Sequence, residues 1–120
     1  MWNERIDALL TGLPQGSEIV LELAATLGMD VSREEWEQAC ATQNVTVSGE
    51  LLEGLLRRRL AIAIQDQSKF RHAHGMLREC LITRAREAER LAQHHLSCAS
   101  VLVKKSGQQG VAERRARHLI

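Results

Sequence analysis

Hydrophobic residues recur every three or four positions along most of this chain, a spacing that predicts amphipathic helices. The first helix is predicted over residues 2–12. The second is predicted over about 15–27, because Pro14 suits the first turn of a helix and Gly28 suits its end. The start of the chain is therefore expected to be helical.

A third helix is predicted over about 33–42. Ser32 and Glu35 have the spacing of a capping box, and Val31 and Trp36 have the spacing of a hydrophobic staple. This local signal explains Trp36 as a core or staple residue more simply than as an aromatic that binds a ligand. We therefore expect Trp36 to be buried.

The hydrophobic period then changes from helical to alternating. Ser48 suits the N-cap of a fourth helix, whose leucines repeat at helical spacing as far as Leu60. Residues 61–64 alternate, residues 65–68 have the composition of a turn, and residues 69–73 alternate again. This pattern predicts a β-hairpin.

Helical spacing returns after the hairpin. The apolar side of the predicted helix consists of Leu77, Cys80, Leu81 and Arg84, followed by Ala88, Leu91, Ala92, His95, Ala99 and Leu102. We expect a bend near Thr83. Adjacent helical residues point in different directions, so we expect His95 on the apolar side and His94 in solvent.

Three helices followed by a two-stranded hairpin is the order of a winged-helix domain. We expect a mainly α fold with a small β-hairpin, in which a helix over 1–12 precedes a winged-helix domain over 13–84. A long C-terminal helix is expected over 85–105, and a polar linker over 106–110. Residues 111–120 then read as the start of a following helical, repeat-like module, so the chain is expected to belong to something longer.

Charge is unevenly distributed, although the net charge is only +1. Residues 1–50 contain 2 basic and 9 acidic residues, a net charge of −7, whereas residues 51–120 contain 14 and 6, a net charge of +8. A basic surface can attract nucleic acid, but solvated helix faces explain most such charge.

The cysteines indicate a reducing compartment. Cys40, Cys80 and Cys98 are odd in number, lack paired spacing and fall on apolar sides of predicted helices. Such residues are typical of reduced, buried thiols in a cytoplasmic protein. No apolar run reaches membrane-spanning length, and the first residues do not resemble a signal peptide. We expect a soluble cytoplasmic protein with no membrane partner.

The sequence predicts neither a catalytic site nor a metal site. It lacks the phosphate-binding pattern G-x-x-x-x-G-K-[ST], so this chain is expected to hold no cofactor of its own. His72 and His74 are two apart, but no cysteine pair accompanies them, as a zinc site would need. Cys80 has no evident base to activate it as a nucleophile. We expect a non-catalytic chain.

Residues 70–79 are the most informative segment, because an alternating strand there leads directly into a helix. His74 lies at the junction. Free backbone N–H groups converge at the start of a helix, so a histidine beside them is well placed to meet an anionic group. Alternatively, His74 only caps the helix or bonds a neighbouring carbonyl.

A set of short motifs occurs in a characteristic order: residues 13–14, 24–28, 51–56, 74–79, 85–88 and 94–95. Together they resemble the winged-helix segment that follows the ATPase core in bacterial signal-transduction ATPases with numerous domains, the relatives of the MalT-type regulators. In several of these proteins the segment lies between that core, sometimes preceded by a serine/threonine kinase, and tetratricopeptide repeats. The resemblance covers about residues 13–105, and residues 111–120 resemble the lead-in to a repeat array. His72 departs from the family, which usually has an aromatic residue there.

The resemblance implies a function for the junction histidine. In the wider family this histidine contacts the β-phosphate of ADP and helps to hold the inactive form, and His74 is the matching position. The implied partners are the chain's own upstream ATPase core, which binds ATP or ADP, and the downstream helical repeats.

Two alternatives remain open at this stage. A winged helix can instead bind DNA through its third helix, here about residues 48–59, whose exposed side is expected to carry Glu50, Glu53 and Gly54. The basic residues available for nucleic-acid contacts are Arg57, Arg58, Arg59, Lys69 and Arg71. The other alternative is a protein-interaction domain that forms a homodimer through residues 85–105.

Overall fold

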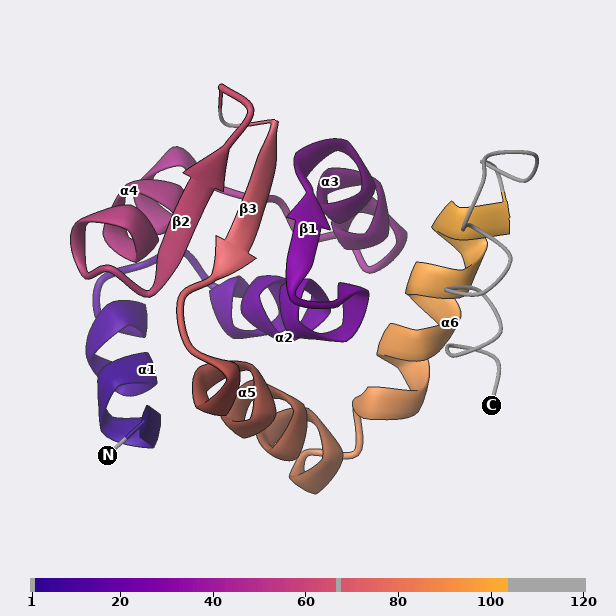
Figure 1. Cartoon of the computed structure of the whole chain (residues 1–120). Helices are drawn as coiled ribbons and strands as arrows, with labels where there is room; N and C mark the ends of the chain where they lie inside the picture. The colour runs from indigo at the N-terminus through magenta and orange to yellow at the C-terminus, as the bar shows by residue number, and fades with distance from the viewer. Residues whose placement is uncertain (1, 67, 104–120) are drawn as a thin grey trace.

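The computed structural model describes residues 2–66 and 68–103. In this part of the chain the fold is mainly helical with a small sheet, as predicted (Figure 1). The helices are α1 (Trp2–Leu10), α2 (Ser17–Leu27), α3 (Arg33–Thr42), α4 (Gly49–Arg57), α5 (Gly75–Glu87) and α6 (Leu91–Val103). The strands are β1 (Asp30–Ser32), β2 (Ala61–Ile64) and β3 (Lys69–His72).

The predicted hairpin is confirmed. β2 and β3 pair antiparallel, with Ala61 opposite His72 and Ile64 opposite Lys69. The sheet also contains β1, which the sequence pattern does not predict. It pairs antiparallel with β3 and gives the order β1-β3-β2. A strand of three residues carries almost no alternation of its own, so only its pairing with β3 defines it.

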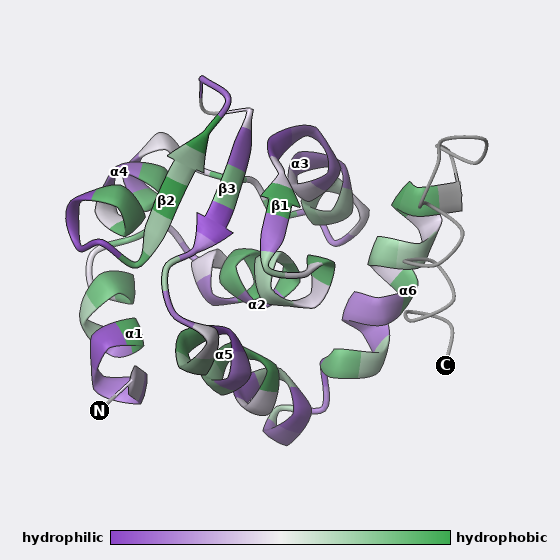
Figure 2. Ribbon diagram, in the orientation of Figure 1, coloured by the Kyte–Doolittle hydropathy of each residue, from purple (hydrophilic) through white to green (hydrophobic). Residues whose placement is uncertain are grey.

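Helix α2 forms the centre of the molecule, with the sheet, α3, α5 and α6 around it (Figure 1). Its ribbon is largely hydrophobic in Figure 2, and Val20, Leu23 and Ala25 are completely buried. Trp36 of α3 packs on this core as predicted, with its indole N–H donating to the Val20 carbonyl at 2.8 Å. Helix α1 joins the same core through Ile6 and other apolar side chains.

The local start signals are also confirmed. The Ser32 hydroxyl accepts a hydrogen bond from the Glu35 backbone N–H at 3.4 Å, and the Ser48 hydroxyl accepts one from the Leu51 N–H at 3.1 Å. Both bonds satisfy N–H groups that have no partner inside the helix. Helix α3 consequently has the bounds that the sequence predicts.

The continuous helix expected over 85–105 is wrong within the described residues. Helix α5 ends at Glu87 and α6 starts at Leu91, so the chain turns at residues 88–90 and not near Thr83. Glu89 adopts a left-handed backbone (φ 61°), and the Arg90 N–H bonds back to the Ala85 carbonyl at 2.8 Å. The turn resets the helical phase, so the apolar stripe cannot be extended across it.

The reset phase overturns the expected orientation of the two adjacent histidines. His94 is completely buried, although solvent was expected, and His95 is only half-buried. Ala88 and Ala92 are exposed, although both were placed on the apolar side. Among residues 91–102, the buried side chains of α6 are His94, Ser97, Cys98, Ala99, Val101 and Leu102.

Two of the three cysteines are buried as expected. Cys40 and Cys98 are completely buried, whereas Cys80 is only half-buried. Burial, with a smaller contribution from the charge of Glu37, raises the pKa of the Cys40 thiol to about 12. Cys40 is therefore protonated and unreactive at neutral pH.

None of the described helices combines the length and the apolar character needed to cross a bilayer. The linker expected over 106–110 and the helix expected over 111–120 lie outside the described residues.

Candidate functional site

The junction between β3 and α5 has the arrangement that the sequence predicts. Strand β3 ends at His72, and His74 is the N-cap of α5, with an extended backbone (φ −139°, ψ 129°). The His74 carbonyl accepts hydrogen bonds from the N–H groups of Leu77 and Arg78 at 3.2 and 3.4 Å. The imidazole makes no capping bond and is exposed to solvent. Side-chain capping, one of the alternatives for His74, is therefore wrong.

One aromatic side chain contacts the exposed imidazole. The rings of Trp2 and His74 have centroids 4.9 Å apart and are tilted by 43°. The guanidinium carbon of Arg5 lies 4.9 Å from the centroid of the same indole. Trp2 is half-buried, whereas Arg5 and His74 are exposed. Helix α1 thus brings an aromatic ring and a cation to the start of α5.

Side chains on both sides of the junction tie it to the end of α2. The His72 ring lies with Nε2 at 3.3 Å from the Ala24 carbonyl, and the Arg78 Nε donates to the Ala25 carbonyl at 2.8 Å. Both carbonyls belong to the last turn of α2. The carbonyl groups of a last turn have no hydrogen-bond partners within the helix and favour a neighbouring positive charge. Burial lowers the pKa of His72, although the Ala24 carbonyl opposes this shift. Neutral His72 therefore donates through Nε2.

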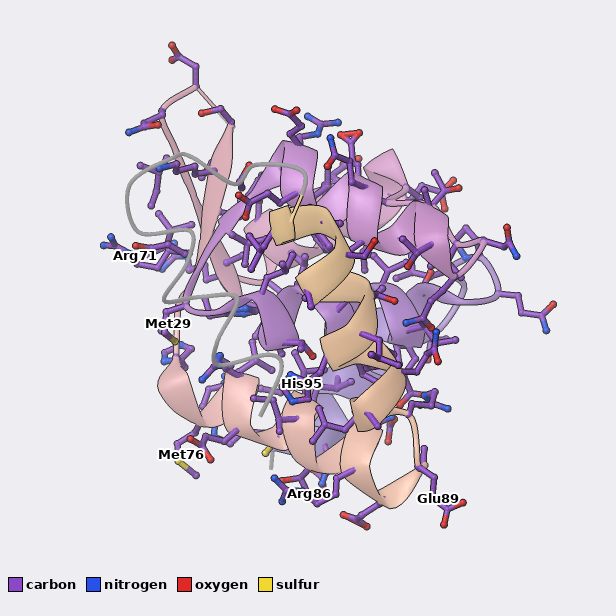
Figure 3. The ribbon with its side chains drawn as sticks, turned by 90° about the vertical axis from the view of Figure 1, so that its right-hand side faces the viewer. Met29, Arg71, Met76, Arg86, Glu89 and His95 are labelled. Carbon is purple, nitrogen blue, oxygen red and sulfur yellow. The ribbon has the colours of Figure 1, made fainter. Side chains whose placement is uncertain are left out.

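Two exposed methionines lie close to the junction. Met76, in the first turn of α5, is 60% exposed, and Met29 is 40% exposed. The Met29 carbonyl accepts the His72 N–H at 3.0 Å, so the turn before β1 adjoins the end of β3. Figure 3 shows Met29 and Met76 along the same edge of the molecule, below Arg71. Flexible thioethers on a surface suit contact with another protein.

The residues proposed for nucleic-acid contacts come from two places in the fold, the end of α4 and strand β3. Arg57, Arg58 and Arg59 are exposed at the end of α4. Lys69 and Arg71 lie on β3, and Arg71 is held by Asp30 of β1 at 2.6 and 3.3 Å. Of the predicted contact residues, the structure brings Lys69 and Arg71 together on one strand.

The exposed side of α4 also differs in one position from the expectation. Glu50 and Glu53 are exposed as expected, but Gly54 is buried against α1. A Cβ atom at Gly54 would lie only 2.8 Å from the Leu9 Cδ1 atom, so glycine permits α1 to pack this closely. The remaining exposed surface of α4 is acidic in its first half, which opposes contact with phosphate.

A second group of polar residues, which the sequence pattern does not predict, connects α2, α6 and the end of α3. Glu22 and His94 are both completely buried, and His94 Nε2 lies 2.8 Å from Glu22 Oε1. Arg90 binds the same carboxylate through two nitrogens, at 2.9 and 2.6 Å. Burial alone would raise the pKa of Glu22, but the hydrogen bonds from Arg90 and His94 outweigh it, and the pKa is lowered.

The other side of His94 faces α3. The Gln43 side-chain amide lies with Nε2 at 2.9 Å from His94 Nδ1 and at 3.1 Å from the Ser97 hydroxyl. Since an amide NH₂ can only donate, Nδ1 is the acceptor and Nε2 carries the proton that goes to Glu22. The Ser97 and Thr42 hydroxyls complete the network at 2.7 Å. We call these residues (Glu22, Arg90, His94, Gln43, Ser97 and Thr42) the buried polar cluster, after its buried members Glu22, His94 and Ser97; the other three reach toward the surface.

Arg84 extends the ionic contacts from this region toward α1. Its Nε donates to Glu18 of α2 at 2.7 Å, and its Nη2 lies 2.9 Å from Asp7 of α1. Its Nη1 also bonds Asn3 at 3.3 Å. Arg84 was expected on an apolar stripe, but it is only partly buried and connects three helices.

The buried polar cluster resembles part of a catalytic arrangement without supplying one. A carboxylate bonded to an imidazole can orient that imidazole as a base. Here the far ring nitrogen faces the Gln43 amide donor, and the Ser97 hydroxyl bonds Gln43 instead of His94. Among the described residues, no group of three or more His, Cys, Asp and Glu side chains can hold a metal ion. The cluster therefore fits a structural role, in which it holds α6 against α2 and α3.

Comparison of this chain with protein-family models, curated proteins and solved structures finds no match.

Proposed function

We propose that this chain is a non-catalytic, winged-helix regulatory module of a larger cytoplasmic bacterial signalling ATPase. It packs on the nucleotide-binding core of that protein and couples the nucleotide state to a helical-repeat sensor. The order of elements from α2 to β3, with the sheet order β1-β3-β2, supports the winged-helix assignment. The resemblance of the motifs supports the family.

The observation that carries the proposal is the exposed imidazole of His74 at the start of α5. In the proposed closed state this ring donates a hydrogen bond to a phosphate oxygen of ADP bound in the core. The first turn of a helix favours a neighbouring anion, and a hydrogen bond to a charged phosphate is stronger than a neutral one. ADP would thereby hold the module against the core.

The surroundings of His74 support a docking surface there. Met29 and Met76 are exposed near the junction, and the ties from His72 and Arg78 to α2 fix the junction on a packed scaffold. A side chain presented by a rigid scaffold loses less freedom on binding than one on a mobile loop. The downstream helices would then transmit the docked or released state, which requires different contacts in the two states.

The test uses the parent protein with His74→Ala. We expect the variant to retain less ADP after gel filtration and to have higher basal activity than the wild type. Arg86→Ala is the matched control, because Arg86 is also exposed but lies at the far end of α5 (Figure 3). Unchanged ADP retention together with unchanged basal activity in His74→Ala would refute the proposal.

Binding of duplex DNA is the second candidate function. The three consecutive exposed arginines Arg57, Arg58 and Arg59 favour it, whereas Glu50 and Glu53 on the same helix oppose it. Fluorescence anisotropy with duplex DNA over a salt series separates the two functions. Binding with a steep salt dependence and a sequence preference would support the DNA-binding alternative.

A homodimer through the C-terminal helices is the third candidate. Leu96 on α6 is 62% exposed, so one large apolar side chain is available outside the core. Light scattering on the chain tests this alternative, and a strictly monomeric result removes it.

A further inference from the structure

Trp2 of α1 contacts His74, the histidine that we propose binds the phosphate. We propose that Trp2 is a positioning residue for His74: its indole holds the imidazole in one orientation, so the seating of α1 determines where His74 points. The inference rests on the proposed function for its consequence, but the contact itself stands on the structure. The two ring centroids are 4.9 Å apart, and the His74 side chain has no capping hydrogen bond.

The indole is itself restrained by the hydrophobic core, against which Trp2 packs, and by Arg5. The Arg5 guanidinium lies 4.9 Å from its centroid, a distance at which a cation is attracted to the ring. Trp2 is half-buried, whereas the imidazole that it contacts is exposed. The better-anchored ring therefore restrains the freer one.

Helix α1 is fixed to both α5 and α4. Arg84 of α5 contacts Asp7 at 2.9 Å and Asn3 at 3.3 Å. Leu9 packs against Gly54 of α4, where a Cβ atom would lie only 2.8 Å from the Leu9 Cδ1 atom. A change in the seating of α1 would therefore displace Trp2 relative to the start of α5.

The contact with Trp2 would preorganise the His74 imidazole for binding. An exposed imidazole free to rotate about its two side-chain bonds must be ordered each time it meets a phosphate, and that ordering weakens binding. An imidazole already held by Trp2 avoids most of this cost. Loss of the indole should therefore speed ADP release from the parent by about 2- to 10-fold, the range expected for one side chain that must be immobilised on binding.

The first measurement examines the contact in this chain without any nucleotide. The ring protons of His74 should show a ring-current shift from the indole in NMR spectra. Trp2→Ala should remove the shift, whereas Trp2→Phe should retain part of it. Trp2→Leu keeps an apolar side chain without an aromatic ring and serves if the alanine variant is unstable. Unshifted His74 signals in the wild type, or signals unaffected by Trp2→Leu, would overturn the proposal.

The second measurement is a double-mutant cycle on ADP release from the parent, with Trp2→Ala, His74→Ala and both together. We expect Trp2→Ala to speed release in the wild type and to have no further effect when His74 is absent. Trp2→Phe should restore most of the wild-type rate. An effect of Trp2→Ala that persists in the His74→Ala background would overturn the proposal.

The two measurements separate this inference from the proposed function. If the NMR shift depends on Trp2 but His74→Ala leaves ADP release unchanged, the proposed function fails and the positioning contact stands. If His74→Ala speeds release and Trp2→Ala does not, the positioning role fails and the proposed function stands.

Discussion

His74 and His94 both lie near the start of a helix, α5 and α6 respectively, but have opposite surroundings. His74 is the N-cap of α5, is exposed and contacts one aromatic ring. His94 lies in the first turn of α6, is completely buried and has a partner at each ring nitrogen. A buried group with all its partners in place stabilises a fold, whereas an exposed group without a fixed hydrogen bond is available to a ligand. The comparison indicates a structural role for His94 and leaves the imidazole of His74 free for the ligand contact that we propose.

The largest expected effect comes from the carboxylate of the buried polar cluster. Glu22→Ala leaves His94 and Arg90 without their shared acceptor, and breaking a buried ion pair in this way costs about 3–5 kcal/mol of unfolding free energy. Urea denaturation of the chain measures the loss. The control is Glu37→Ala, which removes an exposed pair with Arg33 and should cost less than about 1 kcal/mol. Equal costs for the two variants would show that the cluster is not stabilising.

Substitution of the two histidines tests the comparison directly. His94→Ala leaves a cavity and removes a hydrogen-bond donor from Glu22, so we expect a loss of about 1–3 kcal/mol of unfolding free energy. His74→Ala removes an exposed side chain and should change the stability by less than about 0.5 kcal/mol. Thermal denaturation of both variants measures the difference. A larger loss for His74→Ala than for His94→Ala would reverse the assignment.

The lowered pKa of Glu22 predicts acid sensitivity. The folded carboxyl loses its proton more easily than the unfolded one, whose pKa is near 4.5, so the stabilisation is complete above that pH. It is lost as the pH falls through the lower pKa of the folded state. Glu22→Gln should therefore show a weaker decline of unfolding free energy from pH 5 to pH 3, as measured by denaturant titration at each pH.

Asp30 provides the control for this pH series. Its pKa is also lowered, chiefly by the hydrogen bond from Arg71, but the pair is exposed to solvent. Asp30→Asn should therefore alter the decline of unfolding free energy between pH 5 and pH 3 much less than Glu22→Gln. An equal effect of both substitutions would locate the acid sensitivity outside the cluster.

A smaller pH effect is expected from His72. Burial lowers its pKa below the usual 6.5, so the folded protein resists protonating this ring while the unfolded chain accepts the proton. The resulting stabilisation is complete above pH 6.5 and is lost as the pH falls through the folded pKa. His72→Phe should reduce the pH dependence of unfolding free energy just below pH 6.5. An unchanged slope would contradict the lowered pKa of His72.

The parts of the fold that the sequence predicts are those with a local cause. The bounds of α3 follow from the Ser32 cap, and the hairpin follows from alternation on both sides of a turn. His74 could be placed at the start of a helix for the same reason, because the change of period occurs within a few residues of it.

The parts that were missed depend on partners far along the chain. The turn at 88–90 contains neither glycine nor proline, and its Arg90 reaches Glu22 on α2. No local signal marks such a turn, so the phase of α6 and the burial of His94 could not be read from the sequence. Local signals such as helix caps do not reveal the buried polar cluster either. A signal was present only in the spacing of Arg90, His94 and Ser97 on one side of a helix.

The rate of ADP dissociation from the parent protein, measured for the wild type and for His74→Ala, tests the central claim most directly. We expect faster dissociation in the variant at unchanged thermal stability of this chain. Equal dissociation rates in a folded variant would contradict the assignment of recognition to His74.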